Sequence, residues 1–373
     1  NGISIARSCI AWYNRILSAS YRDRDHNSAA LKFLRIVQAD IMSDIDSSAP
    51  DQCAACGKGG DGLKKCTDCK LVNYCDTTCQ KSHRSKHEVG CRKRAAELHD
   101  DVLFEKPPPR EECPMCFLPL PIKFAKQVYK ACCGKTVCHG CSHNMMIECG
   151  FGISKPILCP FCRAPENVNP EEEMKSVYKR MAVNDAESFD NLAGAYHAGS
   201  SFFGLQLDHK KAFELWSRST ELGSIDGHNS LGFAYMYQIG TKADMKKAEH
   251  HLEIAAMAGH VKARHTLGMF EIATGRGRTE RRAWKHFMIA AKAGNADSLE
   301  GMPRAYSRGL ITKEEFEETL RAHKESLDEM KSEQRTRADC ESLSKEEFEA
   351  LSKEEVEETL RAYKESVVKM KSK

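Results

Sequence analysis

The sequence has no long run of apolar residues and no strong excess of charge of one sign. No stretch of its 373 residues approaches the roughly 18 apolar residues that a membrane-spanning helix needs, so no membrane segment is expected. The net charge is +3 with 29% charged residues, which gives no global reason to expect nucleic-acid binding. The basic run at 84–93 is interpreted as a solvated face of the fold.

Cysteine is nearly absent outside one part of the chain. Of the 18 cysteines, only Cys9 and Cys340 lie outside the window from Cys53 to Cys162. The start of the sequence lacks an apolar core followed by a small-residue cleavage site, the pattern of a secretory signal. Disulfide scaffolds are usually small secreted domains, whereas these cysteines form C-x2-C pairs interleaved with histidines. We therefore expect metal binding in an intracellular, reducing compartment, the cytoplasm or the nucleus.

Changes in composition divide the chain into five parts. The predicted parts are a helical lead-in (1–50), a first metal region (53–91), a second metal region (113–163), helical repeats (185–308) and C-terminal helices with an internal duplication (312–373). An amphipathic helix is predicted at 29–42 and a short helix at 93–101. The expected fold is a pair of small metal-stabilised α+β modules followed by an all-α helical-repeat solenoid.

The first metal region supplies eight ligands in four closely spaced pairs, enough for two tetrahedral ions. The pairs are Cys53 with Cys56, Cys66 with Cys69, Cys75 with Cys79, and His87 with Cys91. A tight turn brings two closely spaced thiolates onto one ion, and the spacing of the last pair suits one face of a helix. The mixed cysteine and histidine set favours zinc over an iron–sulfur cluster.

These pairs, with Tyr74 before Cys75 and Gln80 after Cys79, closely resemble a MYND-type zinc finger. The resemblance implies that the pairs interleave. One ion is then held by Cys53, Cys56, Cys75 and Cys79, and the other by Cys66, Cys69, His87 and Cys91. It also implies proline-containing peptides as partners, although the expected aromatic residue five positions after Cys79 is Arg84 here. His83 is interpreted as an exposed helix residue.

The second metal region supplies seven ligands at the spacing of a RING finger. They are Cys113, Cys116, Cys133, Cys138, Cys141, Cys159 and Cys162. The histidine expected two residues after Cys133 is Lys135, which is not an ordinary zinc ligand, so an eighth ligand must come from elsewhere. Cys132 is our first choice, and His139, His143 and Cys149 are the alternatives.

The resemblance to a RING finger implies how these ligands are shared. One ion takes Cys113, Cys116, Cys138 and Cys141, and the other takes Cys159, Cys162, Cys133 and, by our choice, Cys132. With the two ions of the first region, the sequence predicts four zinc ions in the chain.

A RING finger that acts as a ubiquitin ligase has no nucleophile and works by positioning a charged ubiquitin-conjugating enzyme. Three residues match that resemblance. Met115 lies between the first two ligands and Pro160 inside the last pair, where both kinds of residue usually contact the conjugating enzyme. Arg163 follows the last cysteine, where an arginine can bridge conjugating enzyme and ubiquitin. The missing histidine keeps an inactive RING-like scaffold open as the alternative.

The helical part of the sequence repeats. Lys211 to Gly223, Lys247 to Gly259 and Arg282 to Gly294 are three versions of one segment, spaced about 36 residues apart. Such a period predicts a helical solenoid. The Lys-Ala…Ala-Ala-x-Ala-Gly pattern resembles Sel-1-like repeats, relatives of the tetratricopeptide repeat, over about 185–306. The resemblance implies an adaptor with a concave surface for partner proteins; a purely structural stack is the alternative.

The tail contains a second duplication. Residues 313–332 recur 40 residues later as 353–372. Thr312 and Ser352 are predicted N-caps, with Glu315 and Glu355 at the capping-box position. The first copy is expected to cap the open apolar end of the solenoid.

Two functions follow from these regions. The first is a ubiquitin ligase that recruits a ubiquitin-conjugating enzyme through the RING-like region and a substrate through the repeats and the MYND finger. The second is a non-enzymatic adaptor in which all three regions bind proteins. A lysine methyltransferase, which accompanies some MYND fingers, is disfavoured because no segment outside these regions is a candidate cofactor site.

Overall fold

The computed structural model describes residues 52–123, 126–149, 157–166, 169–275, 280–332, 334–336 and 338. The chain forms two compact units, one ending at Pro107 and the other containing the residues from Pro108 onward. Each unit is described by itself. The predicted helix at 29–42 and the second tail copy at 353–372 lie outside the described residues.

In the unit that ends at Pro107, a small antiparallel sheet precedes one long helix. Strand β1 (Lys64–Lys65) pairs with β2 (Asn73–Tyr74). Helix α3 (Thr77–Leu103) begins at Asp76, whose side chain accepts a 2.8 Å hydrogen bond from the N–H of Cys79. The separate helix predicted at 93–101 is wrong in its start, because it is the last part of α3. No proline interrupts 77–103, so nothing ends the helix at the last ligand.

In the other unit, a β-hairpin leads directly into a helix. Strand β3 (Gln127–Lys130) pairs antiparallel with β4 (Lys135–Cys138), with Val128 opposite Val137. Helix α4 (His139–Glu148) follows at once. Cys138 is the last strand residue and also the N-cap of α4, because its sulfur accepts a 3.4 Å hydrogen bond from the N–H of Cys141.

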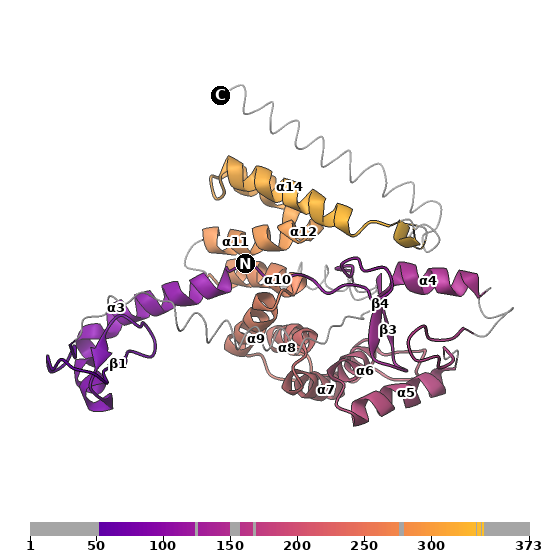
Figure 1. Ribbon diagram of the computed structural model, residues 1–373, viewed down its shortest axis with the longest axis horizontal. Helices are drawn as coiled ribbons and strands as arrows, with labels where there is room; N and C mark the ends of the chain where they lie inside the picture. Colours follow the sequence, from indigo (N-terminus) through magenta and orange to yellow (C-terminus); the bar gives the residue numbers. More distant parts are fainter. Residues whose placement is uncertain are drawn as a thin grey trace, which may run out of the picture. The chain divides into compact units, whose positions relative to one another are not determined.

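The helical repeats form a stack of antiparallel helix pairs. The helices are α5 (Pro170–Ala182), α6 (Ala186–Ala198), α7 (His209–Glu221), α8 (Ile225–Tyr237), α9 (Met245–Met257), α10 (Val261–Thr274) and α11 (Glu280–Lys292). Helix α6 packs on α7, α8 on α9 and α10 on α11, and neighbouring pairs pack on each other (Figure 1). The expected fold class, cysteine-rich modules followed by a helical solenoid, is confirmed.

The second helix of each repeat ends in the same glycine turn. After α9, Gly259 has φ +93° and donates to Ala256 O at 3.1 Å, while the His260 N–H donates to Ala255 O at 2.9 Å. Gly223 and Gly294 have φ +94° and +96°. These two bonds satisfy carbonyls at the helix end, and the left-handed φ favours glycine. The backbone conformation of this turn therefore explains why a glycine recurs at the end of the second helix of each repeat.

Close packing explains the other repeated glycine, which follows a leucine in the first helix of the pair. A Cβ at Gly232 would lie 2.6 Å from Leu252 Cγ, and one at Gly268 would lie 2.8 Å from Phe287 Cε1. Both distances are shorter than real Cβ contacts, so these glycines let α8 approach α9 and α10 approach α11.

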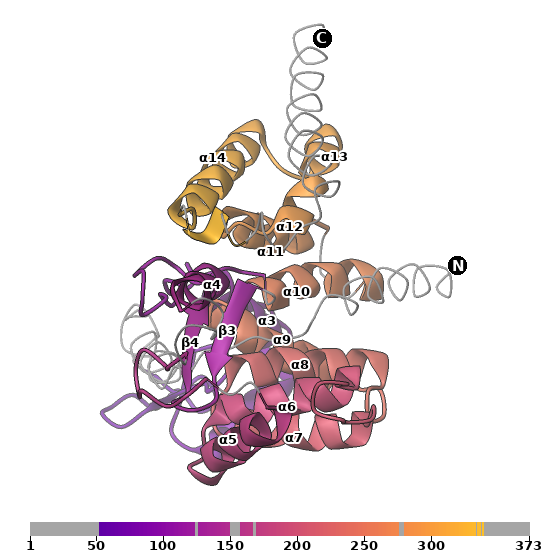
Figure 2. The same ribbon diagram turned by 90° about the vertical axis from the view of Figure 1, so that its right-hand side faces the viewer.

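Among the described residues, helices α12 (Ala296–Glu300), α13 (Met302–Ser307) and α14 (Lys313–Glu329) follow the last pair. Helices α12 and α13 are short, and α14 packs on α11 (Figure 2). The predicted capping box at Thr312 and Glu315 is confirmed, with hydrogen bonds of 3.2 and 2.8 Å. Buried Phe316 packs with Met302 and Ile311, so α14 contributes an apolar face to this end of the stack.

The β-hairpin and the first repeat share one core. Tyr129 and Ala131 are buried in the same cluster as Val177, Leu192 and Trp216. The second cysteine region is therefore packed on the solenoid. Among the described residues, no helix is long and apolar enough to cross a membrane.

Candidate metal centres

The predicted ligands gather into four clusters of four. The clusters are Cys53, Cys56, Cys75 and Cys79; Cys66, Cys69, His87 and Cys91; Cys113, Cys116, Cys138 and Cys141; and Cys132, Cys133, Cys159 and Cys162. Within each cluster the ligand atoms lie within 4.8 Å of one another. Three of these groupings are the ones that the resemblances imply, and the fourth includes Cys132, our choice for the eighth ligand.

The spacing of the sulfur atoms fits tetrahedral zinc. One sulfur–sulfur distance from each cluster is 3.5 Å (Cys56–Cys75), 3.7 Å (Cys66–Cys91), 3.9 Å (Cys116–Cys138) and 3.6 Å (Cys133–Cys159). Zinc–sulfur bonds of about 2.3 Å in a tetrahedron place two sulfurs roughly 3.8 Å apart. The four clusters fit four zinc ions, as expected from the sequence.

Four of the five C-x2-C pairs share one turn geometry; the fifth, Cys138 with Cys141, spans the start of α4. In each of the four, the residue after the second cysteine donates its N–H to the carbonyl of the first; the pairs are Gly57 to Cys53 (2.8 Å), Lys70 to Cys66 (3.1 Å), Phe117 to Cys113 (2.8 Å) and Arg163 to Cys159 (3.0 Å). The donor residues have φ of +73°, +58°, +56° and +62°. Only one of these left-handed positions is a glycine, so three of them hold a side chain at some conformational cost.

Hydrogen bonds from nearby donors affect which thiols ionise most readily. In these four pairs the first cysteine, namely Cys53, Cys66, Cys113 or Cys159, has a lowered pKa. Burial raises the pKa of Cys53, but the N–H groups of Cys56, Cys75 and Ala55 lower it to about 6. Backbone donors stabilise a thiolate. These backbone donors therefore favour the thiolate form of Cys53, whereas the pKa of Cys113 is lowered mainly by hydrogen bonds from Cys138 and Cys141.

Aromatic and amide side chains surround the cluster of His87. Buried Tyr74 packs edge-on to the His87 ring at 6.3 Å, and its hydroxyl is 3.1 Å from Nδ1 of His83. The His83 ring stacks on His87 with centroids 5.8 Å apart. Gln80 donates to Cys66 Sγ at 3.9 Å. His83 is thus half-buried and outside the clusters, a supporting residue that the sequence interpretation placed in solvent.

Cys132 is the candidate eighth ligand that the structure brings to the second cysteine region. The N–H groups of Cys133 and Gly134 both donate to Lys130 O, at 3.0 and 2.8 Å. This tight turn after β3 places the adjacent Cys132 and Cys133 in one cluster. Lys135 is exposed, and His139, His143 and Cys149 belong to none of the four clusters. The ligand role of Cys132 remains a prediction.

The three residues singled out for ubiquitin transfer lie beside the ligands. Met115 packs partly buried on Cys113, Val137 and their neighbours. Pro160 is half-buried, and Arg163 is exposed. Sequence reasoning did not single out Phe117, which is 73% exposed directly after Cys116. The sequence feature that could have identified Phe117 is an apolar residue directly after a ligand pair.

Sequence reasoning also missed the residues that join the hairpin to the repeats. Asp185 accepts hydrogen bonds from the Tyr129 hydroxyl at 2.9 Å and from Arg180 Nε at 2.6 Å. Thr136 of β4 donates to Glu187 at 3.5 Å. Both acids are buried near the start of α6. No ligand spacing or periodicity marks them, because their partners come from another part of the chain.

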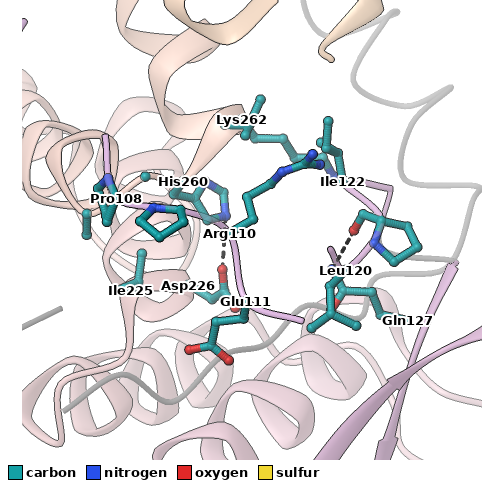
Figure 3. A pocket seen from close by; sticks show the side chains of 15 residues that line it. Pro108, Arg110, Glu111, Leu120, Ile122, Gln127, Ile225, Asp226, His260 and Lys262 are labelled. Carbon is teal, nitrogen blue, oxygen red and sulfur yellow. Dashed lines mark hydrogen bonds and ion pairs between the residues drawn. The ribbon is translucent and has the colours of Figure 1, made fainter. Parts of the chain in front are cut away.

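A pocket of about 130 Å³ lies between residues 108–122 and the starts of α8 and α10 (Figure 3). His260 contacts Asp226 at 2.9 Å, and the Gln127 amide donates to Pro121 O at 2.7 Å. The lining contains no cysteine, so the pocket is separate from the four clusters.

Comparisons with known proteins agree with this arrangement. Residues 53–91 match the MYND finger family, and residues 191–224 and 225–260 each match the Sel1 repeat. Similar solved structures include a Sel1 repeat protein from Oxalobacter formigenes, with 23% identity, a TM-score of 0.37 and coverage of 51% of this chain and 71% of that one. An immunity protein from Pseudomonas aeruginosa has 14% identity, a TM-score of 0.33 and coverage of 52% and 70%. The chain contains a MYND finger and Sel1 repeats.

Proposed function

We propose that the chain is a zinc-built adaptor whose second cysteine region recruits a ubiquitin-conjugating enzyme. The supporting observation is the interleaving of its ligands. The pair Cys113 and Cys116 shares a cluster with Cys138 and Cys141, while the last pair joins the adjacent Cys132 and Cys133. In this interleaved arrangement, each ion joins one outer C-x2-C turn to a ligand pair in or next to the hairpin, as in a RING finger. No nucleophile is required, because positioning supplies the gain in rate.

Met115, Pro160 and Arg163 have distinct roles in this proposal. Half-buried Met115 and Pro160 offer apolar contact to the conjugating enzyme. Arg163 is exposed, and its backbone is fixed by the hydrogen bond to Cys159 O. Its planar guanidinium can donate to carbonyls of two partners at once. It would hold conjugating enzyme and ubiquitin together without touching the metal.

The other two regions would bind the protein to be modified. Sel1 repeats generally mediate contacts between proteins, and MYND fingers commonly bind proline-containing peptides. Arg84, where an aromatic residue is usual, is exposed on α3. We therefore assign recognition of the substrate mainly to the repeats. Reduced thiols in four clusters favour an intracellular location.

The test is ubiquitin transfer by the purified zinc-loaded chain with a panel of conjugating enzymes. We expect transfer with at least one enzyme, a strong loss in Arg163→Ala with unchanged zinc content, and weaker capture of the conjugating enzyme in Met115→Ala. Lys70→Ala is the matched control, because Lys70 is a cation at the equivalent left-handed position of the MYND finger. Equal losses in Arg163→Ala and Lys70→Ala would contradict the role of Arg163.

The second candidate is a non-enzymatic adaptor. The observation that favours it is the core that the hairpin shares with the first repeat, including Tyr129 and Trp216. A cysteine region fixed in this way can serve as a structural part of the repeat surface. The absence of transfer with every conjugating enzyme in the panel would decide for this function.

A further inference from the structure

The turn after α14 carries a buried arginine to the second cysteine region. Arg335 is 7% exposed. Its Nη1 donates to Pro119 O at 2.8 Å and to Met330 O at 2.9 Å. Its Nη2 donates to Leu118 O and to the sulfur of Cys116, both at 3.4 Å. The acceptors of these four bonds are three carbonyls and one cysteine of a metal cluster.

The charge of this guanidinium needs an anionic partner. Carbonyl groups carry no net charge, and an isolated buried cation is costly. Four thiolates on one divalent zinc ion leave two net negative charges, and Cys116 belongs to such a four-cysteine set. In the same turn, the amide oxygen Oε1 of Gln334, an acceptor, lies 3.6 Å from the sulfur of Cys141 in that set. Two groups of one turn therefore face two ligands of one ion.

The backbone allows this approach through one glycine. Gly140 lies on α4 between the ligands Cys138 and Cys141. A Cβ there would lie 2.7 Å from Cα and 2.8 Å from N of Arg335. Because backbone atoms cannot yield as a flexible side chain can, any larger residue would push the Arg335 turn away.

We propose that Arg335 is a positioning residue for the zinc ion of Cys113, Cys116, Cys138 and Cys141. Its N–H group hydrogen-bonds the Cys116 thiolate, offsets part of the negative charge of the cluster and lowers the reactivity of that sulfur. Its bonds to Leu118 and Pro119 hold the chain directly after the first ligand pair. The end of the repeat stack thereby slows loss of a metal ion that is bound 219 positions earlier in the sequence.

The test uses the full zinc-loaded chain with Arg335→Ala, Arg335→Gln and Gly140→Ala. Zinc release to an excess of a chromogenic chelator is followed together with pulsed alkylation of the cysteines, read by mass spectrometry. Outer ligand partners typically change metal affinity by 10-fold or more. We expect one of the four ions to leave about tenfold faster in all three variants, and alkylation to rise at Cys116 and Cys113 but not at Cys132 or Cys66.

Two further measurements separate this role from a general loss of stability. In the cobalt-substituted chain, Arg335→Gln should shift the sulfur-to-cobalt charge-transfer band to lower energy, because the thiolate loses a donor. Arg281→Ala is the control, since Arg281 also contacts the α14 segment, through Glu315 at 2.7 Å, but touches no cysteine. Release at the wild-type rate in Arg335→Ala, or equal acceleration of all four ions, would overturn the proposal. Failure of ubiquitin transfer alone would not affect it.

Discussion

The hydroxyl of Tyr129 donates a 2.9 Å hydrogen bond to Oδ2 of Asp185, 56 positions later in the sequence. The same oxygen accepts from Arg180 Nε at 2.6 Å, and the other oxygen accepts from the N–H of Glu187 at 3.3 Å. One carboxylate thus caps α6, neutralises an arginine and holds the hairpin of the second cysteine region. Its side chain is 1% exposed.

Replacing Asp185 should be among the most destabilising changes in the repeats. Asp185→Ala leaves Arg180 and the Tyr129 hydroxyl without this acceptor and removes the cap of α6. We expect a loss of about 3 kcal/mol in the free energy of unfolding. Tyr129→Phe should cost about 1 kcal/mol, because it removes a single hydrogen bond. Urea unfolding of the zinc-loaded chain measures both.

Asp208→Ala is the control, because Asp208 is an exposed cap of α7. This substitution should cost about 1 kcal/mol, and an equal cost for Asp185→Ala would contradict the prediction.

The eighth ligand of the second cysteine region can be found from zinc content. Cys132→Ser should lower the zinc content by up to one ion per chain, because its sulfur lies in the cluster of Cys133, Cys159 and Cys162. Lys135→Ala should leave four ions, since Lys135 is exposed. Elemental analysis of folded samples is the measurement. Full zinc in Cys132→Ser with loss in His139→Ala or His143→Ala would show that the ligand assignment is wrong.

Loss of zinc from the second cysteine region should loosen the first repeat. Tyr129 and Ala131 share a core with Val177, Leu192 and Trp216, so Cys159→Ser should raise hydrogen exchange in α6 and α7. Cys53→Ser, which removes a ligand of the MYND finger, serves as the comparison and should raise exchange at the start of α3 instead. Unchanged exchange in α6 and α7 after Cys159→Ser would show that the repeats fold independently of the metal.

Two glycines in helices should respond oppositely to alanine. A Cβ at Gly268 would lie 2.8 Å from Phe287 Cε1, so Gly268→Ala should cost about 1–3 kcal/mol through overpacking. Gly90, inside α3, has nothing within 4 Å of the same position. Gly90→Ala should therefore stabilise its unit by up to about 1 kcal/mol, because alanine favours the helix. Thermal unfolding of each variant gives the sign, and the same sign for both would refute the packing explanation.

Stability of the repeats should fall as the pH is lowered below neutrality. The Nδ1 atoms of His228 and His251 lie 3.0 Å apart between α8 and α9. Burial and the neighbouring His251 and His250 lower the pKa of His228 to about 3, and burial with His250 and Lys247 lowers that of His251 to about 4. An unfolded histidine titrates near 6.5. The unfolded chain therefore binds more protons from about pH 6.5 down to these values, and acid favours unfolding across that window.

Urea unfolding between about pH 5 and pH 7 tests this pH dependence. Each histidine contributes a slope of up to about 1.4 kcal/mol per pH unit. His228→Asn should make the free energy of unfolding depend less steeply on pH. Zinc loss at low pH contributes equally to both chains, so it cancels when the variant is compared with the unmutated chain. His99→Asn, at an exposed position of α3, should leave the slope unchanged. An unchanged slope in His228→Asn would show that this histidine does not titrate on unfolding in that range.

The features that can be predicted from the sequence are those with a local cause. A C-x2-C pair needs only one tight turn, a capping box spans three residues at Thr312, and Gly259 ends a helix by its own φ of +93°. The groupings of the ligands came from resemblance to known fingers. The continuous α3 was not predicted, because the ligand pattern ends at Cys91 while nothing in the next residues breaks the helix.

The rest depends on contacts between distant segments. Arg335 meets Cys116 across 219 positions, and Thr136 meets Glu187 across 51. An arginine in a polar segment, or a glutamate at the start of a helix, is usually exposed to solvent. The sequence pattern alone therefore cannot show that Arg335 or Glu187 is buried. The same holds for His83, where helix periodicity gave no reason to expect the Tyr74 hydroxyl as a partner.

The left-handed residue that follows four of the five C-x2-C pairs has a consequence for the diversity of these fingers. Its N–H is committed to the turn, but its side chain takes no part in the metal cluster, and the four turns carry a glycine, a lysine, a phenylalanine and an arginine. None of the last three side chains is a ligand in any of the four clusters. The side chain that each finger presents beside its zinc site can therefore differ from one finger to the next. The set of metal ligands stays the same when that single residue changes.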